Sequence, residues 1–264
     1  MNFLVAQMIS CYNPFETKER NLIKIYSFEK GIHMKAISKM KSLILKYRHA
    51  WVLLYGLIYM PWFCYLEKRQ TIHYLIHSPL DDYIPFVEYF IIPYLLWFVF
   101  LAVTGAYFFF TNRRDFYRLA AFLCSGMTIF LIVSYAYPNV LHLRPSEFPR
   151  ENVFTDMVRW LYRTDTPTNV LPSIHVFNSL AVHMSLTNCE ALRDHKGVRY
   201  GSLVLTLLII MSTMFLKQHS VIDVCCGATL ALFGYLFFYP QKAGEEASGT
   251  AVERIGRNNR RKHY

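Results

Sequence analysis

The residues with the clearest chemical potential are His219 and Asp223, which lie four positions apart in the segment HSVID. On a helix, residues at i and i+4 share one face and lie at neighbouring heights. The carboxylate can then accept a hydrogen bond from one imidazole nitrogen, which fixes the tautomer and leaves the other nitrogen free to attack or to bind. A histidine and an aspartate that only satisfy each other inside a bundle have the same spacing. The pair alone therefore leaves a chemical and a structural interpretation open.

Two further segments contain groups that could hold a phosphate. In LPSIH, Pro172 suits the first turn of a helix, and Ser173 can cap that helix or hold an oxyanion. The free backbone N–H groups of such a helix start bind phosphate, and His175 lies in the same turn, where it could give or take a proton. In LHLRP, the planar guanidinium of Arg144 suits phosphate oxygens. Both residues also have a structural interpretation: His175 could be a core histidine, and Arg144 could anchor the chain at lipid headgroups.

The composition indicates a membrane protein. Of the 264 residues, 54% are hydrophobic and 17% are charged, whereas soluble domains average about 25% charged residues. Fifteen of the 28 Lys and Arg residues lie in 1–48 and 240–264, so long apolar blocks remain between the two ends. Basic residues that flank apolar blocks differ from the basic face with which a soluble domain binds nucleic acid. We therefore expect membrane lipids, and no nucleic acid, as partners.

The same blocks predict an all-α fold, a polytopic membrane bundle of about six transmembrane helices. Most blocks have the length that crosses a hydrocarbon core about 30 Å thick. Pro85 and Pro93 predict tilt or a kink in the second span. The predicted spans are 49–66, 84–110, 117–136, 170–188, 200–216 and 219–239. The predicted parts of the chain are a basic N-terminal cytoplasmic segment at 1–48, a six-span catalytic domain at 49–239 and a basic cytoplasmic tail at 240–264.

The distribution of Lys and Arg predicts the orientation. Loops 111–118 and 189–199 hold six such residues in 19 positions, a higher density than in the loops on the other side. The positive-inside rule then places both termini in the cytoplasm and loop 137–169 outside, and a plasma membrane is the simplest setting. Within that outer loop, residues 155–163 have the pattern of an amphipathic helix lying at the interface. All three candidate segments are expected at the outer face.

The order of these segments resembles the type 2 phosphatidic acid phosphatase superfamily, which shares its core with the vanadium haloperoxidases. That family's pattern is Lys-x6-Arg-Pro, then Pro-Ser-Gly-His, then Ser-Arg-x5-His-x3-Asp. This chain has Arg144-Pro145, then Pro172-Ser173-Ile174-His175, then His219 with Asp223. The resemblance covers roughly 137–223, and six spans is the number found in the membrane enzymes of the family.

The resemblance implies a role for each residue. His219 would attack phosphorus to form a phosphohistidine, and Asp223 would orient it. His175 would protonate the leaving alkoxide and then activate the incoming water or alcohol. Arg144 and the amides near Ser173 would hold the phosphate oxygens. This chemistry implies no metal and no cofactor, and the six cysteines, which include no CxxC pair, predict no metal site either.

Three positions depart from the family pattern. Tyr137 stands where the family has Lys, Thr213 stands where it has Arg, and Ile174 replaces the Gly before the first histidine. Lys217 could supply a substitute phosphate-binding charge, or it could snorkel at the outer end of a span. The departures point toward sphingolipid synthases that transfer inositolphosphate or phosphocholine to a lipid alcohol, which look similar because they keep a His and a later His-x3-Asp, here in HSVIDV.

These features predict a membrane lipid phosphatase, a phosphoric ester hydrolase that acts on a lipid phosphate or diphosphate at the outer face. One alternative is a phosphotransferase that passes a phospho-headgroup to a lipid alcohol. Another is a non-catalytic relative that binds lipid headgroups, since two cationic positions of the family pattern are missing.

Overall fold

The computed structural model describes residues 26, 30, 34–35, 37–69 and 71–240. The chain divides into two compact units, Met1–Ala50 and Trp51–Tyr264. In the first unit, residues 37–46 are helical with mostly exposed side chains. Most of the basic N-terminal segment predicted at 1–48 lies outside the described residues. The same holds for the tail predicted at 240–264, except for its first residue.

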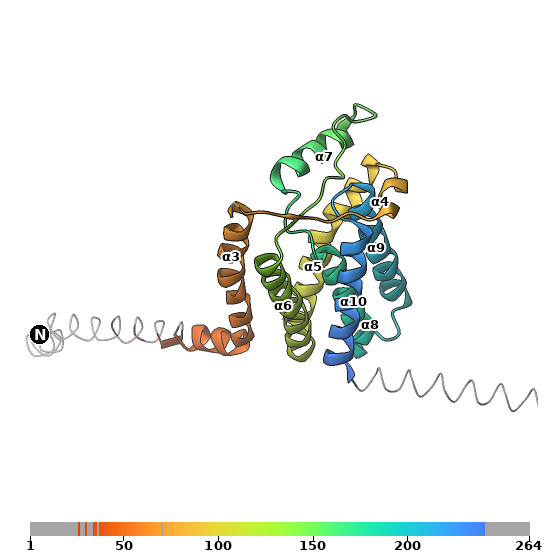
Figure 1. Cartoon of the computed structure of the whole chain (residues 1–264). Helices are drawn as coiled ribbons and strands as arrows, with labels where there is room; N and C mark the ends of the chain where they lie inside the picture. The colour runs from red at the N-terminus through yellow and green to blue at the C-terminus, as the bar shows by residue number, and fades with distance from the viewer. Residues whose placement is uncertain (1–25, 27–29, 31–33, 36, 70, 241–264) are drawn as a thin grey trace, which may run out of the picture. The chain divides into compact units, whose positions relative to one another are not determined.

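The second unit is built from helices. Its one sheet in the described part of the chain pairs β1 (Tyr74–Leu75) with β2 (Asn139–Val140) in parallel. Figure 1 shows the long helices running beside one another, with α4 and α7 at one end of the bundle. The long helices are α3 (Gly56–Lys68), α5 (Ile91–Thr111), α6 (Arg113–Ala136), α8 (Ile174–Asn188), α9 (Lys196–Phe215) and α10 (Val221–Phe238). The shorter elements are α4 (Pro79–Tyr83), η2 (Glu88–Phe90), α7 (Val153–Thr164) and η3 (Glu190–Leu192), and η1 (Arg48–Tyr55) begins in the first unit and ends in the second.

Five described helical segments are long and apolar enough to cross a membrane, which makes the chain a membrane protein with an all-α fold. They are Arg48–Lys68, Glu88–Thr111, Arg113–Ala136, Lys196–Phe215 and Val221–Phe238. Large apolar side chains on these helices remain exposed, among them Leu57 at 72% and Phe237 at 77%. A surface of that kind is stable against lipid tails and unstable against water.

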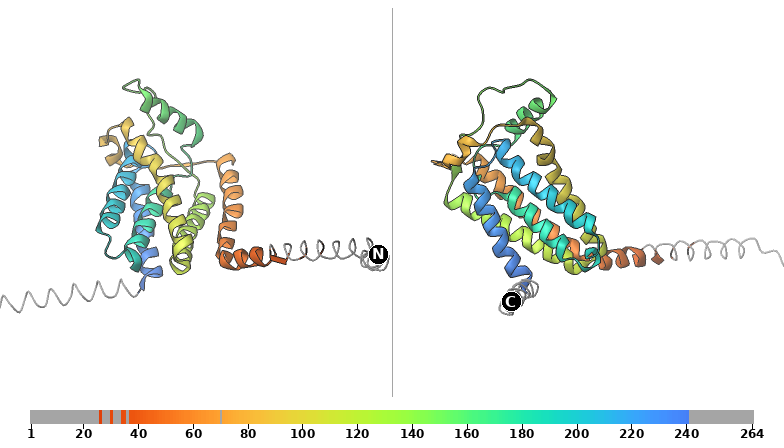
Figure 2. Two further views of the ribbon diagram at one scale, coloured as in Figure 1. Left: turned by 180° about the vertical axis from the view of Figure 1, so that it is seen from behind. Right: turned by 90° about the vertical axis from the view of Figure 1, so that its right-hand side faces the viewer.

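The fourth predicted span, 170–188, is shorter than expected. Its helix α8 begins at Ile174 and has 15 residues, about 22 Å at 1.5 Å per residue, which is less than the thickness of a hydrocarbon core. Ser173 ends the preceding extended segment and caps the helix. The polar side chains of Asn178, Ser179 and Ser185 are buried because α8 packs against α5, α6, α9 and α10 (Figure 2).

Two other predicted boundaries also shift. Pro85 precedes the helical segment, and Pro93 is the third residue of α5, where no intrahelical N–H bond is lost. Helix α6 starts four residues before the predicted 117, because the Asn112 side chain accepts hydrogen bonds from the N–H groups of Arg114 and Asp115. The amphipathic helix predicted at 155–163 is present as α7. Val158 and Leu161, three residues apart, lie on its buried face.

Glycine allows α8 to approach its neighbours closely. A Cβ built on Gly227 of α10 would lie 2.6 Å from the backbone oxygen of Ser173, which cannot move aside without shifting the start of α8. A Cβ on Gly126 of α6 would lie 2.0 Å from the ring of Phe177. The two contacts set the separation of three helices, and the first lies next to the candidate site.

We expect Gly227→Ala to destabilise the protein by about 1–3 kcal/mol, because overpacking forces α10 away from the start of α8. Thermal unfolding of the purified protein in detergent measures the change. Gly201→Ala is the matched control, since a Cβ at that helical position meets nothing within 4 Å. Equal melting temperatures for the two variants would contradict this account of the packing.

Candidate active site

His219, Asp223 and His175 meet inside the bundle. The Nδ1 atom of His219 lies 3.3 Å from Asp223 Oδ2, and its Nε2 atom lies 3.4 Å from His175 Nδ1. The two histidines are 7% and 9% exposed, and the aspartate is fully buried. With Nδ1–H donating to Asp223, the lone pair of His219 Nε2 faces the second histidine. The structure thus brings together the three residues that the sequence analysis assigned to catalysis.

Contrary to what their spacing predicted, His219 and Asp223 do not lie on one face of the same helix. His219 precedes α10, and Ser220 is the N-cap of that helix. Asp223 is the third helical residue, and its Oδ2 accepts the Ser220 N–H at 2.9 Å, which completes a capping box. The carboxylate that caps the helix is therefore the one that orients the histidine.

His175 is held between α8 and α5. Its ring centroid lies 4.7 Å from that of Tyr94 and 4.5 Å from that of Trp97. These aromatic rings restrict the imidazole, so the side chain cannot swing away from His219 without displacing α5 residues. Neither aromatic residue was assigned to the site from sequence, because the contact joins segments about 80 positions apart.

Asp81 fixes the start of α10 from outside the helix. Its carboxylate accepts hydrogen bonds from Ser78 N–H (2.8 Å), from the Ser220 hydroxyl (2.6 Å) and from Val221 N–H (2.8 Å). The side chain is buried although α4 has only five residues. Asp81 was not assigned to the site from sequence, although Ser78-Pro-Leu-Asp81 has the spacing of a capping box.

The candidate phosphate-binding groups have other partners. Lys217 Nζ donates to the backbone oxygen of Asp81 at 2.7 Å, so this ammonium faces α4. The Ser173 hydroxyl accepts from Val176 N–H, and Ser173 N–H donates to the backbone oxygen of Asp223. Two positions that are cationic in the resembled family are uncharged here: Tyr137 stacks on Tyr74, and the Thr213 hydroxyl donates to the backbone oxygen of Ile210.

Arg144 lies beside the site, bound to three oxygens. Its guanidinium donates to the backbone oxygens of Tyr162 (3.1 Å) and Asp165 (2.9 Å) and to Gln218 Oε1 (2.7 Å). Its Nε is buried without a hydrogen-bond partner among the residues that the structure describes. Burial lowers the pKa of Arg144 from its usual value, and the carboxylate of Asp165 opposes that shift. Arg144 thus hydrogen-bonds to Gln218, the residue that directly precedes His219 in the sequence.

A small polar cavity of about 50 Å³ opens at the two histidines. Among the described residues that line it, none is Lys or Arg, and two are acidic. The Tyr94 hydroxyl donates to Asp165 at 3.3 Å, and Glu67 accepts from the Thr166 hydroxyl and from Asn169 Nδ2. The lining residues are Phe63, Glu67, Phe130, Asp165, Thr166, Thr168, Asn169, Val170, Ile174, His175, Gln218 and His219.

The acids of this cavity could not be assigned from sequence. Glu67 lies near the end of α3, and Asp165 follows α7, so only the fold brings them together. Burial raises the pKa of the Asp165 carboxyl above its usual value, although the charge of Arg144 and the Tyr94 hydroxyl oppose the shift. No three His, Cys, Asp or Glu side chains of the described residues gather in a way that would hold a metal ion.

A large apolar groove adjoins the polar cavity. It has a volume of about 960 Å³ and is lined by side chains of α3, α5, α6 and α7, most of them aliphatic or aromatic. Phe63, Asp165, Ile174 and His175 line both spaces, so the groove reaches the histidine pair. A polar chamber that continues into a long apolar groove suits a ligand with a polar head and a hydrocarbon tail.

Comparison with known proteins adds one relative. No protein-family model and no solved structure matches the sequence. An uncharacterized protein of Methanocaldococcus jannaschii is 27% identical over 158 residues, which are 58% of this chain and 59% of that protein. The chain therefore spans less than two thirds of the length of this relative. Fold and site together define the class: an all-α membrane protein with a buried His–His–Asp cluster at one end of an apolar groove.

Replacing Asp81 tests whether α4 holds the start of α10. We expect Asp81→Ala to lower the free energy of unfolding by about 2–3 kcal/mol, because the Ser220 hydroxyl and the Val221 N–H lose their acceptor in a buried place. The neighbouring Asp82 is the control: its side chain is 65% exposed and pairs only with His77 among the described residues. Asp82→Ala should cost less than about 0.5 kcal/mol. A comparable loss in both variants would refute the role of Asp81.

The raised pKa of Asp165 predicts a dependence of stability on pH. A carboxyl whose pKa is higher in the folded state binds protons more strongly when folded, so its contribution to stability falls as the pH rises from the unfolded value toward the folded value. Asp165→Asn should remove this component. Unfolding measured from pH 4 to pH 8 should therefore show a smaller loss of stability for the variant, and parallel curves would show that this carboxyl is not responsible.

Proposed function

We propose that the protein is an integral membrane lipid phosphatase that cleaves a lipid phosphate or diphosphate through a phosphohistidine intermediate. The observation that carries the proposal is the position of His219. Asp223 contacts one of its ring nitrogens, and the other faces His175, which lines both the polar cavity and the apolar groove. The motif order that resembles the type 2 phosphatidic acid phosphatases supports the same chemistry.

In the first step, His219 Nε2 attacks the terminal phosphorus and the bond from that phosphorus to the bridging oxygen of the lipid breaks. Protonated His175 gives its proton to that oxygen, so a lipid phosphate leaves as an alcohol and a lipid diphosphate leaves as a lipid monophosphate. The phosphohistidine retains the proton on Nδ1, and Asp223 stabilises the resulting positive charge. The phosphoryl group has to enter between the two rings, which lie 3.4 Å apart between nearest nitrogens in the free protein.

In the second step, neutral His175 takes a proton from water, and the hydroxide attacks phosphorus. The P–N bond breaks, which releases phosphate and restores His219. Arg144 is the candidate for binding the phosphate oxygens. To do so, its guanidinium would exchange the hydrogen bond to Gln218 for one to the substrate.

A second candidate function is transfer of a phospho-headgroup to a lipid alcohol. The charge of the cavity favours this alternative. Asp165 and Glu67 face the histidines and no described Lys or Arg lines the space, so a singly charged phosphodiester is repelled less than a doubly charged monoester. The first half-reaction is the same, and a lipid alcohol replaces water in the second.

We further propose that both termini are cytoplasmic and that the histidine pair lies at the outer face of the plasma membrane. Loops 111–118 and 189–199, with their dense Lys and Arg residues, support this orientation. The polar cavity and α7 would then face the outside, with the groove open to the bilayer.

An activity assay with a matched variant tests the function. Purified protein in liposomes is given phosphatidic acid, a polyprenyl diphosphate or a phosphodiester lipid, with and without diacylglycerol or ceramide as acceptor. We expect His219→Ala to lower turnover at least about 1,000-fold, since it removes the nucleophile, and His175→Ala to lower it about 100- to 10,000-fold, since it removes the acid–base group. His183→Ala is the control, because this half-buried histidine of α8 bonds Ser202 away from the cavity.

The products separate the candidates. Free phosphate released by the wild type and the control, and lost in His219→Ala, supports the phosphatase. New phospholipid with little free phosphate supports the transferase. Activity that survives in His219→Ala excludes both mechanisms.

A further inference from the structure

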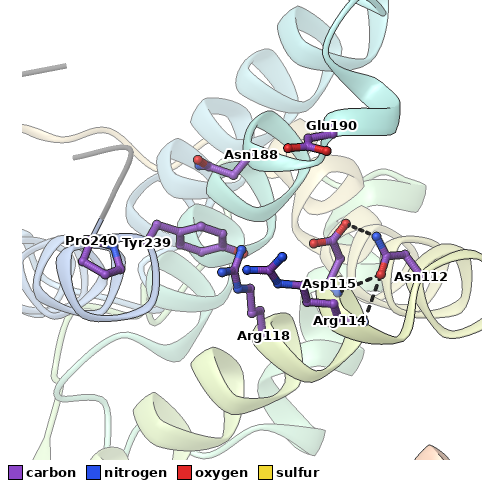
Figure 3. A pocket seen from close by; sticks show the side chains of 8 residues that line it. All are labelled: Asn112, Arg114, Asp115, Arg118, Asn188, Glu190, Tyr239 and Pro240. Carbon is purple, nitrogen blue, oxygen red and sulfur yellow. Dashed lines mark hydrogen bonds between the residues drawn. The ribbon is translucent and has the colours of Figure 1, made fainter. Parts of the chain in front are cut away.

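A second pocket lies at the end of the bundle opposite the histidine pair. It has a volume of about 360 Å³ and lies between the start of α6 and the ends of α8 and α10 (Figure 3). By contrast, His175 lies at the start of α8 and Asp223 lies at the start of α10. The eight lining residues are Asn112, Arg114, Asp115, Arg118, Asn188, Glu190, Tyr239 and Pro240.

The position of this pocket matches the headgroup level of the other leaflet. Helix α10 has 18 residues, which span about 27 Å, close to the thickness of a hydrocarbon core. If the histidine pair lies at one face of the bilayer, this pocket lies at the opposite face. The last two turns of α10 expose Phe233 and Phe237, as a surface in contact with acyl chains does.

Two arginines form one side of the pocket. Arg114 and Arg118 are four residues apart on α6, and Figure 3 shows their guanidinium groups side by side near the ring of Tyr239. The Arg118 guanidinium lies 5.5 Å from the centroid of that ring. Within the described part of the chain, neither guanidinium makes an ion pair. Like charges at this spacing repel, and a phosphate that bridges two planar forks relieves the repulsion.

One acid lies opposite the arginines. Glu190 lies there on η3, beside Asn188, and its side chain is exposed (Figure 3). The second acid, Asp115, lies on α6 next to Arg114, where its carboxylate accepts a hydrogen bond from Asn112 Nδ2 at 2.8 Å. The lining charges balance, which favours a ligand that carries both a phosphate and an ammonium group over a simple anion.

We propose that this pocket binds the headgroup of an amine-bearing phospholipid from the leaflet opposite the histidine pair. The phosphodiester lies between Arg114 and Arg118, and the primary ammonium donates to Glu190. The site is separate from the chemistry of His219, so it does not depend on the proposed function.

Lipid binding by the full-length protein in detergent tests the proposal. Retained lipid is measured by native mass spectrometry against added phosphatidylethanolamine, phosphatidylcholine or phosphatidylglycerol, and soluble phosphoethanolamine serves as the headgroup without a tail. We expect Arg118→Gln and Arg114→Gln each to weaken binding of phosphatidylethanolamine by about tenfold, the loss of one charge-assisted hydrogen bond. Arg193→Gln, an exposed arginine that does not line the pocket, is the control.

Selectivity tests the acidic side. Glu190→Gln should reduce the preference for phosphatidylethanolamine over phosphatidylcholine, because a quaternary ammonium has no N–H to donate, while binding of phosphatidylcholine changes little. His219→Ala should leave all of these affinities unchanged. Equal retention by wild type, Arg114→Gln and Arg118→Gln would overturn the proposal, as would a preference for phosphatidylglycerol, which has no ammonium, or equally tight binding of soluble phosphoethanolamine.

Discussion

The start of α10 is where the fold and the site depend on the same hydrogen bonds. The Asp223 carboxylate accepts from the Ser220 N–H and contacts the ring of His219, so one buried group ends the loop and orients the imidazole. Asp81 accepts from Ser220 and Val221 on the other side. A buried carboxylate without such donors is costly, and here each acid is met by the backbone of the segment that it orders. A change in either acid alters helix position and imidazole position together.

The second constraint is the burial of α8. This helix carries His175, and its polar side chains are satisfied mainly along its own backbone, as when the hydroxyls of Ser179 and Ser185 donate to the carbonyls four residues earlier. These internal hydrogen bonds allow α8 to lie among α5, α6, α9 and α10, although Asn178 Oδ1 is buried there without a hydrogen-bond partner among the described residues. Gly227 brings α10 close to the backbone of Ser173, so His175 at the start of α8 and His219 just before α10 come within 3.4 Å of each other.

The charge distribution differs between the two ends of the bundle. At the histidine end, acids line the polar cavity and the nearest arginine is bound to three oxygens. At the other end, two arginines of α6 share a pocket with Glu190. A groove of about 960 Å³ extends from the first of these ends along α3 and α5. The proposed lipid substrate would enter this groove from the bilayer, with its head toward His175 and its tail in an apolar environment.

Short-range patterns in the sequence were enough to determine the membrane class, the helical fold, the pairing of His219 with Asp223, the helix cap at Ser173 and the amphipathic helix α7, although Pro172 precedes that cap and is not in the first turn. These properties depend on residues a few positions apart, whose periodicity and capping chemistry can be read along the chain. Only the tertiary structure decided that α8 is short and enclosed, that His175 meets His219, and that Asp165, Glu67 and Asp81 face the site or support it. It also decided that Lys217 turns toward α4. These outcomes depend on contacts between residues 27 to 139 positions apart, because packing among helices, and not local preference, selects which polar groups are buried together.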